Sequence, residues 1–248
     1  MTDVRLGKHA YRHDPRTLRL GAYLDPGILP PAPSVVDVAG GVDSWPMYLN
    51  DRLGDCTCAA AGHMIEAWSH ASSGATTKIA DQDVVAAYGQ VNQGVDQGAP
   101  ELDVLRLWRT AGIGGHKIGA FAAVDYGNHE MVRDACWLFD GLYIGVLLPL
   151  AAQHMGSSWH VPGGRGADSE AGSWGGHAVD VVRVDRYGLT VVSWGELVRM
   201  SWGFWDRYVD ECWAVLSTDA LSGAGKTREG FALADLTADL AKIGKVAA

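Results

Sequence analysis

The chain has 248 residues, of which 48% are hydrophobic and 20% are charged, and its formal net charge at pH 7 is −9. This composition is that of a globular protein with a full core, and the acidic excess argues against a surface that follows nucleic-acid phosphates. No apolar run is long enough to span a bilayer, and the first residues lack the apolar stretch of a signal peptide. We therefore expect no nucleic-acid and no membrane partner, and a protein that is cytoplasmic or packaged in a virion.

The first 48 residues have little periodicity and several prolines, for example in Leu29-Pro-Pro-Ala-Pro33. A residue before proline is biased away from the helical region of backbone space. We predict that residues 1–48 form an extended arm that lies over the surface of the domain.

Residues 49–115 show helical patterns. The first predicted helix begins at Asp55 or Cys56 and stops before Ser72-Ser-Gly74. A shorter helix, which Asp81 or Asp83 can cap, runs through 84–88. A third, with its apolar residues on one stripe, covers 101–109.

Residues 116–217 are dominated by strand patterns. Asn128 can cap the one longer helix of this part, which ends near Asp140, and a turn of helix is expected at 204–208. The stretch 156–176 is rich in Gly and Ser and is expected to be a long surface loop. The predicted strands are 117–124, 142–148, 178–184, 189–192, 198–200 and 212–216.

This order, helices first and strands later, predicts an α+β fold with a helical half, about 49–115, packed on an antiparallel-sheet half, about 116–217. Residues 218–248 are expected to be a linker followed by an amphipathic helix at Phe231–Ile243.

The four cysteines stand at positions 56, 58, 136 and 212. Their uneven spacing argues against a disulfide framework. Cys136 lies in a helical pattern and Cys212 in a strand pattern, so both are interpreted as buried apolar residues.

Cys56 follows Gly54-Asp55 at the predicted start of a helix. Unpaired backbone N–H groups and the helix dipole favour a thiolate at such a position, and the thiolate is the nucleophilic form of cysteine. The alternative is a small apolar residue on the buried face of the helix. Cys58 offers a second alignment of the nucleophile, although the preceding Gly-Asp favours Cys56.

His177 follows the pair Gly175-Gly176 and opens a β-branched run. The glycines leave the approach to the histidine free of side chains, as the wall of a cleft requires. A cysteine from the helical half and a histidine from the sheet half can meet across a groove and act as nucleophile and base. The alternative for His177 alone is a residue of the core or of a strand edge.

Taken together, these segments resemble the papain-like cysteine peptidase superfamily, in its small bacterial and phage-borne form. The resemblance covers about residues 29–216, and it implies that fold with its cleft between the two halves. The segments that carry it are Leu29-Pro-Pro-Ala-Pro-Ser-Val-Val-Asp37, Asn50 with Gly54-Asp-Cys56-Thr57, Gly176-His177-Ala178-Val179, and Val192-Ser193-Trp194-Gly195.

The resemblance implies a role for each matched residue. Cys56 is the nucleophile, His177 the base, and Asn50, six residues before Cys56, takes the place of the family's oxyanion-hole glutamine. Trp194 corresponds to the tryptophan that shields the base from water.

Two positions depart from the family pattern. Asn50 is one methylene shorter than glutamine, although its amide can still donate to an oxyanion. Val192 stands where the family has an asparagine that orients the histidine, and valine cannot form that hydrogen bond. The orienting partner must then be Ser193, Asp180 or a backbone carbonyl.

Two other motifs carry little weight. Cys56 and Cys58 with His63 and Glu66 suggest zinc, but the C-x-C spacing crowds a tetrahedral site. The segment Gly223-Ala-Gly-Lys-Thr227 resembles the end of a phosphate-binding loop but lacks its first glycine. We expect no metal and no cofactor.

The leading hypothesis is a papain-like cysteine hydrolase that cleaves a peptide or isopeptide amide of a peptide or protein substrate through an acyl-enzyme on Cys56. The rival hypothesis is a weak or inactive relative that keeps the fold as a binding or assembly module, for example in a phage particle. In that case the N-terminal arm and the C-terminal helix contact the protein partners.

Overall fold

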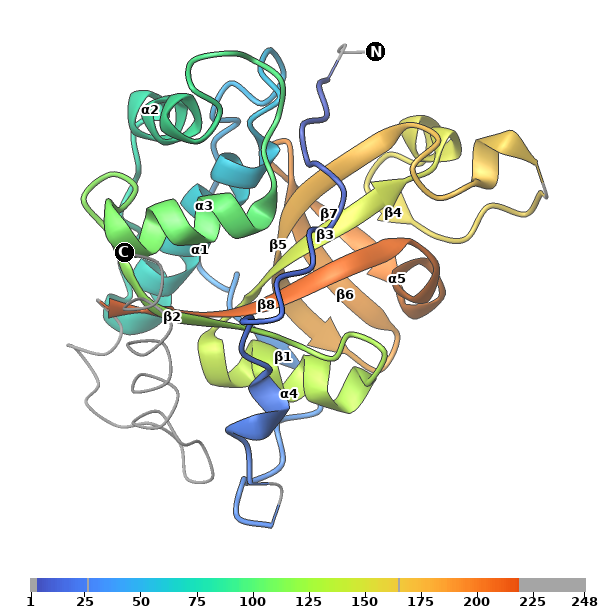
Figure 1. Ribbon diagram of the computed structural model, residues 1–248. Coiled ribbons are helices and arrows are strands. Elements are labelled where there is room, and N and C mark those ends of the chain that lie inside the picture. Colours follow the sequence, from blue (N-terminus) through green and yellow to red (C-terminus); the bar gives the residue numbers. More distant parts are fainter. Residues whose placement is uncertain (1–3, 26, 165, 219–248) are drawn as a thin grey trace.

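The structure is a computed structural model that describes residues 4–25, 27–164 and 166–218 (Figure 1). The helices are α1 (Cys56–Ser73), α2 (Asp81–Val91), α3 (Glu101–Thr110), α4 (His129–Phe139) and α5 (Trp202–Tyr208), with short 3-10 turns η1 (Leu20–Ala22), η2 (Leu150–His154) and η3 (Ala167–Ser169). The strands are β1 (Val36–Asp37), β2 (Ile118–Ala123), β3 (Leu142–Leu148), β4 (Ser158–Trp159), β5 (Gly175–Asp185), β6 (Gly188–Ser193), β7 (Glu196–Ser201) and β8 (Val209–Ser217).

Helix α1 is the central helix of the helical half. Every residue from Cys56 to Trp68 is buried, which is the pattern of a helix with core on all sides. It ends where Gly74 adopts a left-handed conformation with φ of 73° and donates its N–H to the carbonyl of His70. Both ends lie close to the positions that the sequence predicts.

The strands form one sheet in the order β2-β8-β3-β5-β6-β7-β4, with β1 paired to β5. Among the described residues β4 and β7 pair in parallel, and the other pairs are antiparallel. Helices α1, α2 and α3 lie together beside this sheet, and α4 and α5 lie with its strands (Figure 1). The predicted α+β fold with a helical half and a sheet half is therefore confirmed.

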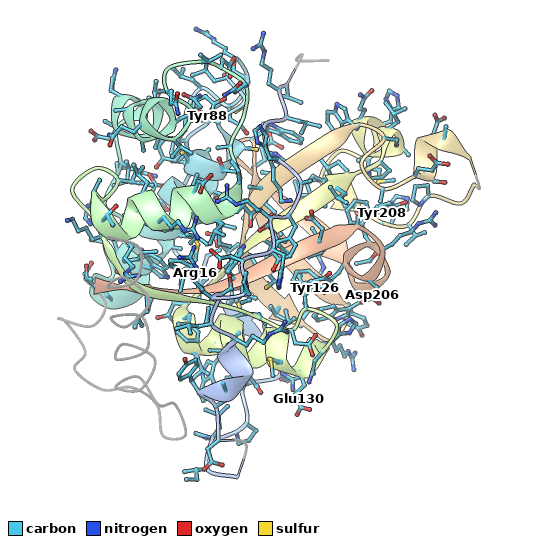
Figure 2. All side chains as sticks on the ribbon, viewed as in Figure 1. Arg16, Tyr88, Tyr126, Glu130, Asp206 and Tyr208 are labelled. Atoms are coloured by element: carbon cyan, nitrogen blue, oxygen red, sulfur yellow. The ribbon has the colours of Figure 1, made fainter. Side chains whose placement is uncertain are left out.

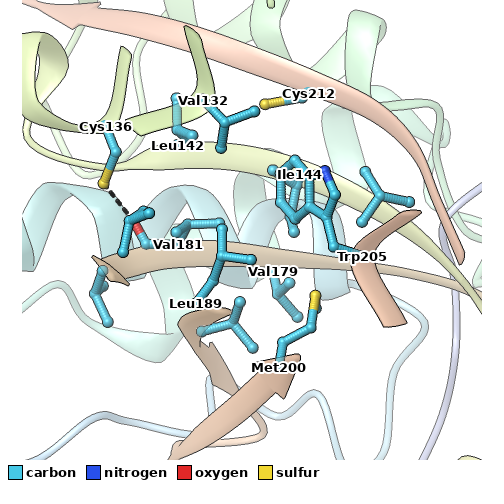
Figure 3. Close-up of a cluster of buried hydrophobic side chains, with 14 of the residues drawn as sticks. Val132, Cys136, Leu142, Ile144, Val179, Val181, Leu189, Met200, Trp205 and Cys212 are labelled. Carbon is cyan, nitrogen blue, oxygen red and sulfur yellow. Dashed lines mark hydrogen bonds between the residues drawn. The ribbon is translucent and has the colours of Figure 1, made fainter. Parts of the chain in front are cut away.

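The buried apolar residues form two hydrophobic clusters. One contains the inner residues of α1, α2 and α3 with Tyr143, Ala178 and Trp213 from the sheet. The other lies between the sheet, α4, α5 and the N-terminal arm (Figure 3). Cys136 and Cys212 are buried in this second cluster, as expected, and all four cysteines are free thiols.

Helix α4 begins at the predicted cap, where the side chain of Asn128 accepts hydrogen bonds from the backbone N–H groups of Glu130 and Met131. The stretch 156–176, expected to be a loop, also contains β4 and η3. Strand β4 has only two residues, paired to Arg199 and Met200 of β7. A segment this short has no readable periodicity, so the sequence did not reveal it.

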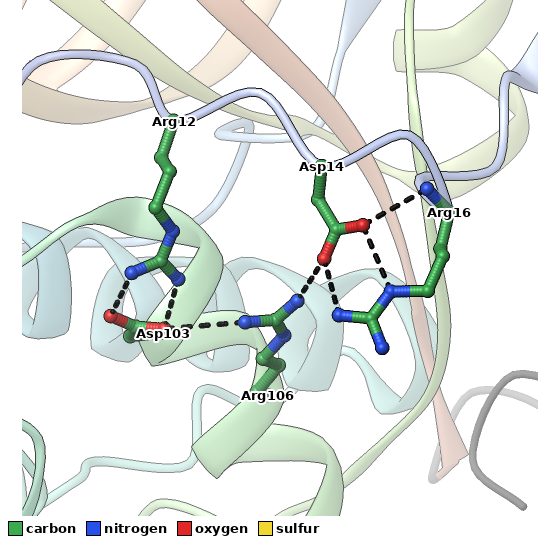
Figure 4. A network of polar contacts seen from close by, with 5 residues as sticks. All are labelled: Arg12, Asp14, Arg16, Asp103 and Arg106. Atoms are coloured by element: carbon green, nitrogen blue, oxygen red, sulfur yellow. Dashed lines mark hydrogen bonds and ion pairs between the residues drawn. The ribbon is translucent and has the colours of Figure 1, made fainter. Parts of the chain in front are cut away.

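The N-terminal arm is mostly exposed or half-buried, but a few of its side chains are buried in the body of the protein. Leu20 is fully buried and Lys8 nearly so, and the arm runs along the boundary between the helices and the strands (Figure 1). A chain of ion pairs fastens it to α3: Arg12 pairs with Asp103, and Asp14 pairs with Arg106 (Figure 4). These contacts hold the arm against both the helices and the strands.

No helix in the described ranges is long and apolar enough to cross a membrane. The predicted C-terminal helix at 231–243 lies outside the described residues.

Candidate active site

Cys56 is the first residue of α1 and lies against strand β5. Its thiol is buried, and burial raises its pKa to about 11, while hydrogen bonds from the backbone of Ala178 and Gly7 act in the opposite direction. Ala178 is the residue after His177, and Gly7 belongs to the arm. The thiol therefore lies at the point where α1, β5 and the arm meet.

The sheet contributes one edge of strand β5 to the place where Cys56 and the arm meet. The carbonyl of Gly176 and the N–H of Ala178 point toward the same edge of an antiparallel strand. The first accepts a 3.1 Å hydrogen bond from the N–H of Lys8, and the second faces the sulfur of Cys56. The backbone on both sides of His177 is thus in contact with the arm or with the nucleophile candidate.

The ring of His177 is held by three side chains. Its Nε2 lies 3.0 Å from the hydroxyl oxygen of Ser193. The ring stacks on Trp194, with centroids 4.2 Å apart and planes 14° apart, and Trp159 meets it edge-on at 6.4 Å. Burial, with a smaller contribution from His63, lowers the pKa of His177 to about 3. Its Nδ1 has no hydrogen-bond partner among the described residues.

Trp194 owes its position to a tight turn. Ser193 pairs with Glu196 across the hairpin of β6 and β7, and the two turn residues, Trp194 and Gly195, have φ of 48° and 75°. Two positive φ values are the mark of a type I′ turn, and a tryptophan in the left-handed region is strained. Strain of this kind clusters at functional sites, and here it places the indole on His177.

Val192 and Asp180 do not orient His177. The two residues are paired across β5 and β6, and Val192 is buried. Because side chains alternate along a strand, Asp180, three residues after His177, lies on the opposite face. Of the three partners considered from the sequence, Ser193 is the one whose hydrogen bond to the imidazole is present.

Asn50 follows a strained turn in which Tyr48 and Leu49 have φ of 56° and 63°. Its side-chain NH₂ group lies 3.0 Å from Oδ1 of Asp55 and 3.2 Å from the carbonyl of Leu53. Both of its hydrogens are therefore engaged in this structure, and a donor role toward an oxyanion requires that one of them be released.

Asp55 is a site residue that the sequence analysis treated only as the start of a helix. It is fully buried beside Cys56, and burial raises its pKa to about 7, with the hydrogen bond from Asn50 opposing the shift. Its side chain makes no capping hydrogen bond to α1. The Asp-Cys dipeptide was the available signal, but a residue at a helix start is ordinarily a cap.

Cys58 and the proposed zinc ligands are engaged elsewhere. Cys58 is fully buried among the helices, and burial raises the pKa of its thiol. His63 Nε2 lies 2.8 Å from the carbonyl oxygen of Pro46, and Glu66 accepts a hydrogen bond from the hydroxyl of Tyr48. In the described part of the chain no three His, Cys, Asp or Glu side chains are grouped to hold a metal.

Glycines on the arm and on both halves allow close contact between their backbones. A Cβ on Gly7 would lie 1.7 Å from the carbonyl oxygen of Gly54, and a Cβ on Gly98 would lie 2.1 Å from the carbonyl oxygen of Gly7. On the sheet side, a Cβ on Gly176 would lie 2.2 Å from the carbonyl oxygen of Lys8. Any side chain at these positions would exclude the arm, so the groove is shaped for a closely packed extended backbone.

Backbone hydrogen bonds fix the arm from both halves. From the helical half, Ala99 donates to the carbonyl of Gly7 at 2.8 Å and accepts from the N–H of His9 at 3.2 Å. From the sheet half, Gly176 accepts from Lys8. The arm thus lies as an extra extended segment between the two halves, directly beside Cys56.

No protein-family model and no curated protein matches the sequence. Among solved structures, xylellain, a cysteine protease from Xylella fastidiosa, superposes with a TM-score of 0.67 at 12% identity, over 87% of this chain and 97% of xylellain. The chain has the papain-like cysteine peptidase fold.

Two plant structures with the papain-like fold are also similar. The proform of Amb a 11, a cysteine protease and ragweed pollen allergen, has a TM-score of 0.57 at 14% identity, over 76% of this chain and 67% of that one. Bromelain from Ananas comosus has a TM-score of 0.54 at 16% identity, over 74% and 99%. At these identities the likeness concerns the fold alone.

Proposed function

We propose that the chain is a cysteine peptidase that cleaves a peptide or isopeptide amide, with Cys56 as nucleophile and His177 as base. One observation carries the proposal. The thiol at the start of α1 lies beside the residue that follows His177, in a groove where backbone groups of both halves already hold an extended segment of polypeptide.

The reaction requires a proton to move from Cys56 to His177. The sulfur then forms a bond to the substrate carbonyl carbon, and the C–N bond breaks as the imidazolium returns the proton to the leaving amine. Water attacks the resulting thioester with the imidazole as base, which releases the acid and restores the thiol. The backbone N–H groups at the start of α1, which have no intrahelical acceptor, are available to the oxyanion.

Ser193 and Trp194 serve the base in this proposal. The hydroxyl at 3.0 Å from Nε2 holds the ring in one orientation and leaves Nδ1 for the proton from Cys56. The stacked indole keeps water away from this hydrogen bond. The hydroxyl is a neutral partner, as the family's asparagine is, so it orients the ring without adding a charge that would stabilise the imidazolium.

In the structure, the thiol of Cys56 and the imidazole of His177 are both uncharged. A thiol pKa of about 11 and an imidazole pKa of about 3, both caused mainly by burial, leave both groups neutral at pH 7. The arm contributes to this burial because Gly7 packs on Gly54 beside Cys56. We infer that residues 5–9 must leave the groove before a substrate can enter and before the thiolate can form.

A second candidate function is a binding or assembly module that has kept the fold. The buried Val192, which cannot orient the base, and the occupied groove favour it. Such a protein would bind a partner in the same groove. Its Cys56 would remain unreactive even when the arm is displaced.

Activity of an arm-displaced variant distinguishes the two functions. Gly7→Ala places a Cβ where the backbone of Gly54 lies, which displaces the arm. The variant is incubated with unfolded casein, and the fragments are identified by mass spectrometry. We expect cleavage that is lost when Cys56→Ala is added and retained when Cys58→Ala is added. Cleavage that survives Cys56→Ala would refute the assignment, and no cleavage by any variant would favour the binding module.

A further inference from the structure

The side chain of Lys8 enters a closed acidic pocket next to the groove. Its ammonium has no exposed surface, and it lies 2.8 Å from Oδ2 of Asp210 and 2.8 Å from Oε1 of Glu211. It also lies 3.1 Å from the carbonyl oxygen of His9. A lysine ammonium has three donors and no acceptor, so these three oxygens match it fully.

The pocket contains more carboxyl groups than the one lysine contacts. Glu101, at the start of α3, is fully buried, and neither of its carboxylate oxygens has a hydrogen-bond partner among the described residues. Burial and the neighbouring Glu211 and Asp210 raise the pKa of Glu101 well above its usual value, whereas the charge of Lys8 acts in the opposite direction. A cluster of buried carboxyl groups is costly in the folded protein unless a cation is placed beside it. Together with the two carboxylate oxygens at 2.8 Å from the ammonium, this indicates that the pocket is built to receive a cation.

The shape of the pocket also favours a lysine. A Cβ on Gly145 of β3 would lie 1.9 Å from Cε of Lys8 and 2.7 Å from Cγ of Glu211. The absence of a side chain at Gly145 is therefore what admits the aliphatic stem of lysine. An arginine would bring five donors in a planar fork to a site with three matched oxygens.

The two halves of the protein each supply part of this pocket. Glu101 comes from the helical half, whereas Asp210, Glu211 and Gly145 come from β8 and β3 of the sheet. The residue that fills the pocket is next to Gly7, whose backbone contacts the thiol of Cys56. A side chain in this pocket thus fixes the register of an extended segment relative to the nucleophile candidate.

We propose that the pocket of Glu101, Asp210, Glu211 and Gly145 is a lysine-binding subsite of the groove, that Lys8 is its resident occupant, and that the substrates are peptides or protein segments with a lysine in the same place. The statement about substrates rests on the proposed peptidase function. The statement about binding does not, because it concerns only which side chain the groove selects.

Binding of a peptide with the sequence Val4–Arg12 tests the subsite without catalysis. The protein is the full chain with Gly7→Ala and Lys8→Gln, so that its own arm is displaced and offers no ammonium to the pocket. Fluorescence anisotropy gives the Kd of the labelled peptide and of versions with norleucine or arginine at the lysine. We expect the lysine peptide to bind at least ~10-fold more tightly than either, since charge-assisted hydrogen bonds are lost with norleucine and mismatched with arginine.

Two further substitutions test whether the preference for the lysine peptide comes from this pocket. Glu211→Gln and, separately, Gly145→Ala are expected to remove the preference for lysine. Glu130→Gln on α4, an exposed residue (Figure 2) that is not part of the pocket, is expected to keep it. Circular dichroism of each variant confirms that it is folded. Equal Kd values for the lysine and norleucine peptides on the folded parent would overturn the proposal.

Cleavage of the same peptides separates this inference from the proposed function. Lysine-dependent binding without cleavage would support the lysine subsite and would count against the proposed peptidase function. If the lysine and norleucine peptides bind with the same Kd and are cleaved with the same kcat/KM, the peptidase function is supported and the lysine subsite is overturned.

Discussion

The backbone N–H of Lys8 donates a 3.1 Å hydrogen bond to the carbonyl of Gly176, the residue that precedes His177. This single contact connects the arm to the strand that carries the candidate base. We propose that an incoming peptide uses the same carbonyl, so that occupation by the arm and occupation by a substrate exclude each other. On this proposal, the reactivity of Cys56 should follow the fraction of molecules in which the arm is out of the groove.

Displacement of the arm should expose Cys56 to alkylation. In the wild-type protein the thiol pKa of about 11 predicts slow labelling by iodoacetamide that rises only as the pH approaches this value. Gly7→Ala should shift the rise to lower pH, toward or below the free-thiol value of about 8.5, because the sulfur becomes hydrated. Peptide mapping assigns the label to Cys56. Gly89→Ala, on α2 with open space around its Cβ, is the matched control, and identical curves for all three proteins would contradict the role of the arm.

Removal of the Ser193 hydroxyl should weaken the positioning of His177. The 3.0 Å hydrogen bond is between neutral groups and is worth about 0.5–1.5 kcal/mol. In the Gly7→Ala background we therefore expect Ser193→Ala to lower kcat by about 2- to 10-fold, with little change in KM. The ¹⁵N chemical shifts of the His177 imidazole should change as well. An unchanged kcat together with unchanged shifts would show that Ser193 does not position the base.

Much of the fold follows from local sequence patterns. The Ala-rich run after Cys56, the cap at Asn128 and the apolar run at 142–148 each specify their element without help from distant residues, and each is found where it was expected. The arm is different. Its burial depends on glycines that lie far away in the sequence, such as Gly54 and Gly176, and no local pattern identifies which backbone will cover them.

For the candidate site, the sequence likewise predicts the individual residues but not their surroundings. Cys56 and His177 are marked by their flanking glycines, but their environment depends on distant partners. Trp159 reaches His177 from a two-residue strand, and the acidic pocket joins residues of α3 and β8 through Lys8. Such sets form only when separate elements pack, so the sequence could give the nucleophile and base candidates but not what surrounds them.

Asn50 and Asp55 should be coupled in stability. Asn50→Ala leaves the buried carboxyl of Asp55 without its 3.0 Å partner, which costs about 1–3 kcal/mol. At about 2–4 °C per kcal/mol for a chain of this size, thermal unfolding should show a clear loss in Tm. In the double variant with Asp55→Ala the loss should be smaller than the sum of the single losses, because no unpaired carboxyl remains. Strict additivity would show that the hydrogen bond is not formed in solution.

Asp180 should destabilise the protein as the pH rises. Its carboxyl is fully buried without a hydrogen-bond partner among the described residues, and burial raises its pKa well above the usual value. Between the unfolded pKa of about 3.9 and the raised folded pKa, the folded state holds the proton more tightly. Stability contributed by this group is therefore present at low pH and is lost as the pH rises through that window.

Asp180→Asn removes this loss, because the amide is neutral at every pH. We expect a higher Tm than wild type at pH 7 and a smaller difference at pH 4, measured by differential scanning calorimetry. Asp185→Asn, on the same strand, is the matched control with the opposite sign. Burial tends to raise the pKa of Asp185, but the hydrogen bonds from Arg199 and from the backbone N–H of Tyr187, together with the charges of Arg199 and Arg183, outweigh burial and lower the pKa. Asp185 therefore stabilises the fold above its unfolded pKa, and the variant should lose Tm at pH 7. A lower Tm for Asp180→Asn at pH 7 would mean that the carboxylate is ionised and paired in solution.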